Sequence, residues 1–96
     1  MTLAELRRQW RDEILRLARL HGARNVRVFG SVVRGEATTA SDLDLLVEME
    51  PGRNYLDLVA LWQDLQDTMG CPVDVLTDGG VSPYLHDKIY GEAVPL

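Results

Sequence analysis

Apolar residues recur along the first twenty positions at the spacing of one face of an α-helix. Thr2 and Glu5 stand three residues apart, as the two partners of a capping box do, so we expect the helix to start at about Leu3. Gly22 suits the left-handed residue that often ends a helix. The stripe that we predict to face the core consists of Leu3, Leu6, Trp10, Ile14, Leu17 and Ala18.

Three short segments carry the β-branched and aromatic residues typical of strands: residues 25–30, 42–48 and 72–77. After the first, Ser31 is expected to cap one or two helical turns over 32–36, and the small polar residues 37–41 predict a loop. Glu-Pro-Gly at 50–52 and Asp-Gly-Gly at 78–80 predict turns.

Two further helices complete the pattern. Asn54 can cap a long helix that Gly70 ends, and Ser82 and Pro83 are expected to start a last helix, as N-cap and first residue, that ends near Gly91. The buried face predicted for the long helix consists of Tyr55, Leu58, Trp62, Leu65 and Met69. Helical spacing of this kind favours core packing over a cofactor or partner surface.

The resulting order, α-β-α-β-α-β-α, predicts an α/β fold with a small three-stranded mixed sheet flanked by helices. With 96 residues we expect a single domain over 1–96. A domain of this size buries only roughly 60–65% of the surface that its unfolded chain exposes. A partner subunit would therefore add useful stability.

Charge and composition narrow the possible functions. The net charge of −5 argues against bulk binding of nucleic acid, which needs many phosphate-facing cations. No apolar run is long enough to span a membrane. Cys71 is the only cysteine, so we expect no internal disulfide and a reduced, cytoplasmic setting. The arginines of the first helix form either a solvated face or a docking surface for an acidic partner: Arg7, Arg8, Arg11, Arg16 and Arg19.

Gly30 and Ser31 stand at a predicted strand-to-helix turn. A glycine there lets a ligand approach the backbone closely. The N–H groups that open the following helix favour phosphate, and the Ser31 hydroxyl adds a donor. Gly-Ser alone, however, is a common turn.

Three aspartates supply the second chemical feature. Asp42 and Asp44 lie two apart on a predicted strand, so both carboxylates should project from one face. Asp74, between two valines in an apolar strand, is expected to be buried and to reach the same site if its strand is the neighbour. Three close carboxylates call for cations, with Mg²⁺ the natural occupant. Alone, Asp-x-Asp can be a cap or a solvated strand end, and Asp74 can be paired with an arginine or sit at a strand edge.

Together these residues resemble a known family. The stretches Val28–Ala37 and Ser41–Val47 give Gly-Ser, a ten-residue spacer and Asp-x-Asp, which is similar to the signature of the minimal nucleotidyltransferases of the polymerase-beta-like superfamily. Residues 72–76 resemble the third-aspartate strand of that family, and residues 89–94 its C-terminal helix.

The resemblance implies roles for specific residues. Asp42, Asp44 and Asp74 would bind metal, two Mg²⁺ ions or Mn²⁺ in their place, and carry catalysis. Gly30 and Ser31 would bind the triphosphate of ATP. Arg34 would touch phosphate, or brace the loop through an ion pair with Glu36 or an aspartate. By contrast, we expect His21 and His86 to be helix-end or surface residues, and Cys71 to be structural.

The resemblance also implies a partner. Stand-alone members resemble antitoxins that transfer AMP to a tyrosine of a HEPN-type toxin, so we expect a protein adenylyltransferase that can form a hetero-oligomer. One alternative is a non-catalytic module that neutralises its partner by contact. Another is a nucleotidyltransferase for a small molecule, working as an oligomer.

Overall fold

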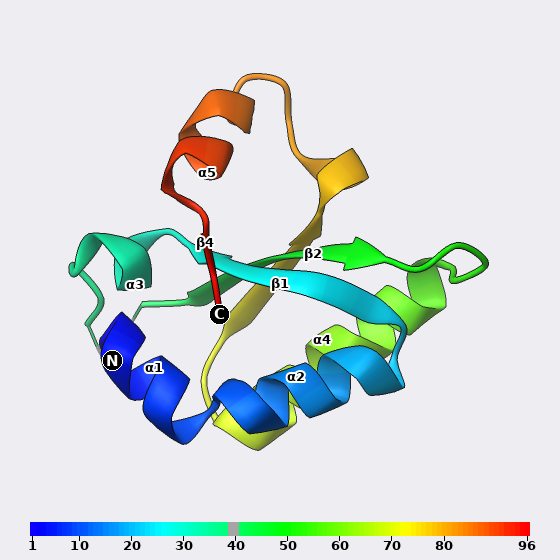
Figure 1. The fold of residues 1–96 in the computed structure, drawn as a ribbon, viewed down its shortest axis with the longest axis horizontal. Coiled ribbons are helices and arrows are strands. Elements are labelled where there is room, and N and C mark those ends of the chain that lie inside the picture. The colour runs from blue at the N-terminus through cyan, green and yellow to red at the C-terminus, as the bar shows by residue number, and fades with distance from the viewer. Residues whose placement is uncertain (39–40) are drawn as a thin grey trace.

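Helices cover both faces of one mixed β-sheet (Figure 1). A computed structural model describes residues 1–38 and 41–96, so part of the loop predicted over 37–41 lies outside the described residues. The helices are α1 (Leu3–Gln9), α2 (Arg11–Leu20), α3 (Ser31–Arg34), α4 (Tyr55–Met69) and α5 (His86–Glu92), with a 3-10 turn, η1 (Asp78–Gly80). The strands are β1 (Ala23–Phe29), β2 (Leu43–Met49), β3 (Val73–Thr77) and β4 (Val94–Pro95).

The sheet runs in the order β3-β2-β1-β4. Strand β1 is antiparallel to β2 and β4, whereas β2 and β3 are parallel and joined through α4. The α/β fold is confirmed, but the prediction of three strands missed β4. That strand has only two residues, one of them Pro95, and so carries no strand pattern in the sequence.

Alternation along β2 divides the sheet into two faces. Leu43, Leu45 and Val47 enter the main core, which α1, α2 and α4 cover. Leu46 points to the opposite face and packs with Phe29 and Ile89 in a second, smaller cluster. Figure 1 shows α5 and η1 on that second face. Asp44 alternates with Leu45 and therefore lies on the face that α5 covers only in part.

Polar contacts tie α5 to the sheet. The Tyr90 hydroxyl donates to Asp78, and Arg27 Nη2 donates to the same carboxylate over 2.9 Å. The Arg27 guanidinium also lies 5.8 Å from the centre of the Tyr90 ring, and its hydrogen bond holds the pKa of Asp78 below its usual range. These contacts fix α5 beside the C-terminal end of β1.

The first predicted helix is two helices. Trp10 has φ −123° and ψ −13°, outside helical geometry, and separates α1 from α2. The hydrogen-bond ladder still crosses it, because Trp10 N–H donates to Leu6 and Trp10 C=O accepts from Ile14. The capping box, the buried stripe and the left-handed Gly22 are confirmed, with Leu3 and Trp10 partly buried.

Two predicted helix starts were wrong. Gly30, not Ser31, is the N-cap of α3, and Ser31 is its first residue. Ser82 caps a separate turn, closed by a hydrogen bond from Leu85 N–H to Ser82 C=O, and α5 begins only at His86. A serine before a proline satisfies a turn as well as a helix start, so the sequence does not distinguish the two.

The predicted buried face of α4 was partly wrong. Leu61 and Leu65 are buried, whereas Tyr55 is 75% exposed and Trp62 37% exposed. The helix therefore presents part of its apolar stripe beside the edge strand β3 instead of to the core. This exposed apolar surface adjoins the candidate site described below.

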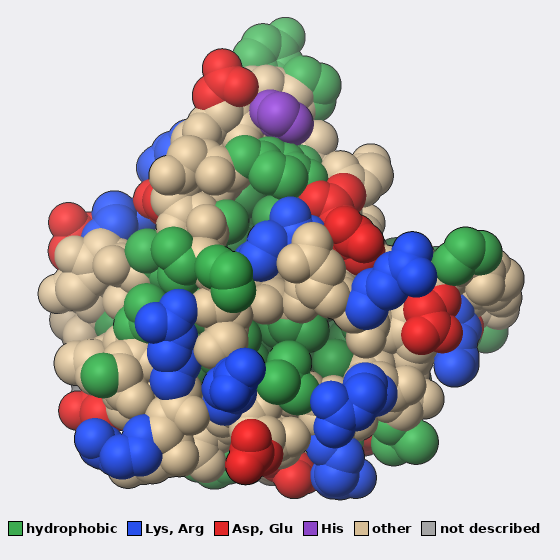
Figure 2. Space-filling model, in the orientation of Figure 1, with side chains coloured by type: hydrophobic (Ala, Val, Ile, Leu, Met, Phe, Trp, Pro, Cys, Tyr) green, Lys and Arg blue, Asp and Glu red, His purple; other side chains and the backbone are tan. Residues whose placement is uncertain are grey.

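The arginines of α1 and α2 gather on one surface (Figure 2). Arg7 donates to the Pro95 and Leu96 carbonyls, and Arg16 pairs with Glu13. Docking to an acidic partner stays a prediction for the other three. No helix in the described part of the chain is both long and apolar enough to cross a membrane.

The second cluster should contribute measurably to stability. Ile89 is 6% exposed and Leu85, one turn earlier, is 49% exposed. We expect Ile89→Ala to lower the free energy of unfolding by about 2 kcal/mol, because it leaves a cavity against Phe29 and Leu46. Leu85→Ala, the matched control, should cost under ~0.5 kcal/mol. Urea unfolding measures both, and equal midpoints would contradict this packing.

Candidate active site

The parallel pairing of β2 and β3 sets Asp44 directly opposite Asp74. Both residues alternate with buried neighbours, Leu43 and Val73, so both carboxylates project from the face away from the main core. Asp44 is half-buried and Asp74 is exposed. Of the alternatives that the sequence left open for Asp74, the structure bears out the strand edge: β3 is an edge strand, so Asp74 is exposed and not buried in an apolar strand.

The surroundings of Asp44 make it a weaker acid. The pKa of Asp44 rises from an ordinary 3.8 to about 6. Burial is the largest cause, followed by the negative charges of Asp74 and Asp42 and a hydrogen bond with Asp74, while Arg34 acts in the opposite sense. The site thus concentrates negative charge that a cation would neutralise.

Asp42 lies just outside this pair. It is exposed and precedes β2 by one residue, so it is not on the strand as predicted. Its charge nevertheless acts on Asp44 and, after burial, is the second cause of the raised pKa of Cys71. Among the described residues, no three His, Cys, Asp or Glu side chains are already arranged to hold a metal ion. The structure joins Asp44 to Asp74 and leaves Asp42 at the margin.

Gly30 lies against Asp44 because Phe29 and Asp44 are paired in the β1–β2 ladder. It has φ 80° and ψ −152°, a conformation that side chains rarely adopt, and a Cβ there would collide with Asp44 Oδ2. Ser31 follows as the first helical residue, and within the described residues its hydroxyl makes no hydrogen bond. The predicted phosphate turn and the carboxylates are therefore adjacent.

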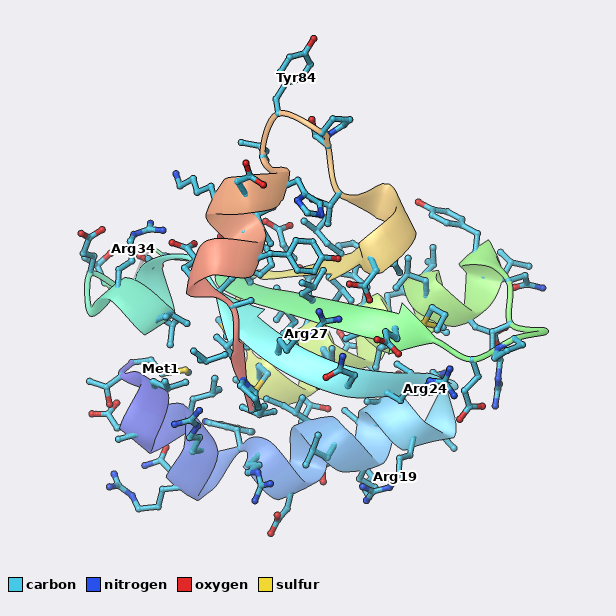
Figure 3. The ribbon with its side chains drawn as sticks, turned by 45° about the horizontal axis from the view of Figure 1, so that its top comes forward. Met1, Arg19, Arg24, Arg27, Arg34 and Tyr84 are labelled. Atoms are coloured by element: carbon cyan, nitrogen blue, oxygen red, sulfur yellow. The ribbon has the colours of Figure 1, made fainter. Side chains whose placement is uncertain are left out.

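Glu92 of α5 braces that turn. Its Oε1 accepts from Gly30 N–H over 2.8 Å and from Arg34 Nη1 over 3.0 Å. Arg34 also donates to Glu36 over 3.1 Å, which confirms the predicted ion pair with Glu36. Figure 3 shows Arg34 on α3, next to α5. The roles of Arg34 and Glu92 are thus linked, and sequence reasoning missed Glu92 because 58 residues separate the two.

A hollow of about 210 Å³ opens on the Gly30 side of the carboxylates. Its charged walls are two acids, Asp44 and Glu92, and two cations, Arg34 and Lys88. Lys88 is the only lysine of the chain and is exposed. Sequence reasoning missed it because the last predicted helix offered no sign of which residues face the site.

A groove of about 410 Å³ opens on the other side of the carboxylates, between α4 and β3. Its walls are apolar except at one end, where Asp74 is its only charged residue: Tyr55, Leu58, Val59, Trp62, Asp74 and Val75. Asp44 therefore borders the cationic hollow, and Asp74 borders the apolar groove.

The remaining candidates lie elsewhere, as predicted. His21 caps the end of α2 and contacts Asp64 of α4 over 2.5 Å. His86 is exposed at the start of α5, with its ring 4.5 Å from that of Tyr90. Cys71 is a free thiol that packs against the main core.

Comparison with known proteins identifies the family. The profile of the family described as "Nucleotidyltransferase domain" matches residues 8–95. The chain belongs to this family. The resemblance drawn from Gly-Ser and Asp-x-Asp is thus confirmed. Members of the nucleotidyltransferase family use nucleotide substrates, typically with divalent metal ions.

Two relatives carry more specific names. The chain is 39% identical over 94 residues to the Methanocaldococcus jannaschii protein named "Putative protein adenylyltransferase MJ0435", over 98% of this chain and 97% of that one. It is 34% identical over 73 residues to "Protein adenylyltransferase MntA" of Thermococcus cleftensis, over 76% and 74% of the two chains.

Solved structures share the fold of this nucleotidyltransferase. A structure described as a "putative minimal nucleotidyltransferase" has a TM-score of 0.84 and 47% identity, over 100% of this chain and 97% of that one. A second holds a tri-AMPylated Shewanella oneidensis HEPN toxin in complex with an MNT antitoxin, with a TM-score of 0.66 over 88% and 66% of the chains. At 19% identity, that second likeness shows the fold alone.

The raised pKa of Asp44 predicts how the metal-free protein responds to pH. An acid whose pKa is higher folded than unfolded destabilises the fold above that pKa, and the penalty disappears as pH falls from about 6 to about 4. In EDTA at pH 8, Asp44→Asn should raise the free energy of unfolding by about 1 kcal/mol, a value already reduced for solvent screening. For a domain of this size that gain corresponds to a rise in Tm of about 4 °C.

At pH 4 that gain should vanish. Asp67→Asn on the exposed side of α4 is the control and should leave Tm near the wild-type value at pH 8. Differential scanning fluorimetry gives all the values. An Asp44→Asn variant no more stable than wild type at pH 8 would mean that the ionised Asp44 carboxylate does not destabilise the fold.

The Glu92 brace predicts a difference between two glutamates that share Arg34. Glu92→Ala leaves Gly30 N–H without its acceptor and should cost about 2 kcal/mol of unfolding free energy. Glu36→Ala removes only an ion pair whose carboxylate side chain is 66% exposed and should cost under ~0.5 kcal/mol. Urea midpoints compare them, and equal losses would show that Glu92 does not support the turn.

Proposed function

We propose that this nucleotidyltransferase transfers AMP from ATP to a hydroxyl group of a HEPN-type toxin and so acts as its antitoxin. The acceptor that we propose first is the hydroxyl of a tyrosine. The observation that carries the proposal is the position of the Asp44–Asp74 pair between a polar hollow, to which Arg34 and Lys88 contribute, and an apolar groove. A group-transfer site needs one side for the leaving group and the opposite side for the acceptor.

The hollow suits the phosphates of ATP. Gly30 gives the backbone room for close approach, and the Ser31 hydroxyl and the first N–H groups of α3 are donors for phosphate oxygens. Lys88 adds a positive charge from α5. Arg34 Nε donates to Glu36 and its Nη1 donates to Glu92. Its Nη2 makes no hydrogen bond among the described residues and can therefore donate to a phosphate.

The carboxylates suit divalent metal. Asp44 and Asp74 are acceptor-only ligands when ionised, and their mutual repulsion and the raised pKa of Asp44 are relieved by a cation. Asp42, at the exposed edge of the site, is the third donor. Two Mg²⁺ ions, or Mn²⁺, would supply charge neutralisation and alignment of the triphosphate when bound.

The chemical step is an in-line displacement. The acceptor oxygen forms a bond to the α-phosphorus, and the bond from that phosphorus to the bridging oxygen of pyrophosphate breaks. Pyrophosphate leaves with the bonding electron pair into the Lys88 side of the site. The hydroxyl proton passes to the Asp74 carboxylate, which borders the groove from which the acceptor approaches.

The choice of a protein acceptor rests on the relatives. Two proteins that match three quarters or more of this chain are named protein adenylyltransferases. A protein acceptor also supplies its own positioning through its interface, which a small molecule would need from further pockets in this chain. The single free cysteine accords with the cytoplasmic setting in which such a module would act.

Mass spectrometry of the partner tests the proposal. We expect the HEPN-type protein that co-purifies with this chain to gain mass in AMP-sized steps after incubation with ATP and Mg²⁺. The double substitution Asp42→Asn, Asp44→Asn should lower the rate of AMP transfer by at least 100-fold, because two of three metal donors are weakened. This variant should still co-purify with the partner protein.

Three other outcomes would contradict it. An unmodified partner that the double variant silences as well as wild type does would mean inhibition by contact alone. AMP found only on small molecules would mean a small-molecule transferase. Full activity of the double variant would remove Asp42 and Asp44 from the reaction.

A further inference from the structure

We propose that the groove between α4 and β3 is where an extended segment of the protein acceptor docks, so that its hydroxyl reaches Asp74 along the edge of the sheet. This inference rests on the proposed function and deepens it, since it assigns the acceptor to one surface of the molecule. The occupant is an apolar or aromatic stretch around the acceptor residue, with no acidic residue beside it.

The order of the strands decides the side of approach. The phosphate turn follows β1, Asp44 stands on β2 and Asp74 stands on β3. Leaving and attacking oxygens lie on opposite sides of the α-phosphorus in an in-line displacement. With pyrophosphate on the β1 side, the acceptor hydroxyl must come from the β3 side, and β3 is the edge of the sheet.

The groove on that side is apolar and already shaped. Tyr55 and Trp62 are 75% and 37% exposed, which is unusual for large apolar side chains on a helix that packs against a core. Trp62 Nε1 donates to the Val73 carbonyl over 2.6 Å, so the indole is held against β3. An aromatic wall fixed in this way can receive a partner without losing side-chain freedom.

The strand edge offers main-chain contacts as well. Both backbone groups of Val73 point toward α4, because its N–H donates to Gln66 Oε1 and its C=O accepts from Trp62. Backbone groups two residues further along a strand point the same way, so those of Val75 face the groove that Val75 lines. An extended segment can therefore add beside β3 at Val75, as peptides do at exposed sheet edges.

Charge selects among possible segments. Asp74 is the only charged residue of the groove, and Asp44 stands opposite it on β2. An acidic side chain next to the acceptor would be repelled by this pair of carboxylates, whereas a neutral hydroxyl can donate to Asp74. The surface therefore favours a hydroxyl residue between apolar neighbours.

The test uses the AMP-accepting partner protein and a matched pair of tyrosines. Tyr55 lines the groove, whereas Tyr84 is 97% exposed on the turn before α5, where it projects from the body (Figure 3). We expect Tyr55→Asp to raise KM for the acceptor at least 10-fold and to change KM for ATP less than twofold. Tyr84→Asp should change neither. Both side chains are exposed, so both variants should fold.

Three kinetic outcomes would overturn the inference. A rise in KM for ATP with Tyr55→Asp would assign the groove to the nucleotide base. A rise in KM for the acceptor that is confined to Tyr84→Asp would place the acceptor on the α5 side. Unchanged KM values in both variants would mean that the groove has no role in transfer.

Photo-crosslinking separates failure of this inference from failure of the proposed function. A benzoylphenylalanine at position 55 of the Asp42→Asn, Asp44→Asn variant should crosslink to the co-purified partner within a few residues of its acceptor hydroxyl, and one at position 84 should not. This needs docking but no transfer. A partner that is captured from position 55 of this variant, but that the wild-type protein does not adenylylate with ATP and Mg²⁺, would contradict the catalytic function and keep the groove. Self-crosslinking from position 55 would mean that a second copy of this chain occupies it.

Discussion

The register between two parallel strands is the constraint on which this site depends. Leu43 pairs with Val73 in the core, and this packing sets Asp44 opposite Asp74 on the other face. A slip of β3 by one residue would turn Val73 outward and Asp74 inward, which the core does not permit. The hydrophobic core thus imposes an unfavourable pair of like charges, visible as the raised pKa of Asp44. The two carboxylates lower the stability of the fold, and a cation bound between them would offset their repulsion.

The second constraint is the closure of the phosphate turn by the end of the chain. Gly30 must approach Asp44 closely, and Glu92 holds its N–H and Arg34 together. Contacts of Arg27 with Asp78 and Tyr90 hold α5, and hence Glu92, in position. Residues far apart in the sequence therefore shape one small region on the α5 face of the sheet.

Much of this could be predicted from the sequence, and what could not has physical causes. Gly-Ser and Asp-x-Asp are local patterns, so the resemblance to the family, which implies that Gly30 and Asp44 share one site, could be recognised in the sequence. Glu92 and Lys88 take part only through tertiary packing of α5, which no local pattern reveals. Tyr55 and Trp62 have the helical period of core residues, and only the edge position of β3 leaves them exposed. The two-residue strand β4 owes its existence to pairing with β1 and not to its own sequence.

A crystal structure of the protein with Mg²⁺ and a non-hydrolysable ATP analogue tests the central claim most directly. If Asp44 and Asp74 separate a leaving-group side from an acceptor side, the β- and γ-phosphates will lie beside Gly30, Ser31 and Lys88. The metal will contact Asp44, and the groove along Tyr55 and Trp62 will stay free of nucleotide. Phosphates in that groove, or a triphosphate bound away from Gly30 with no metal on Asp44, would contradict the account.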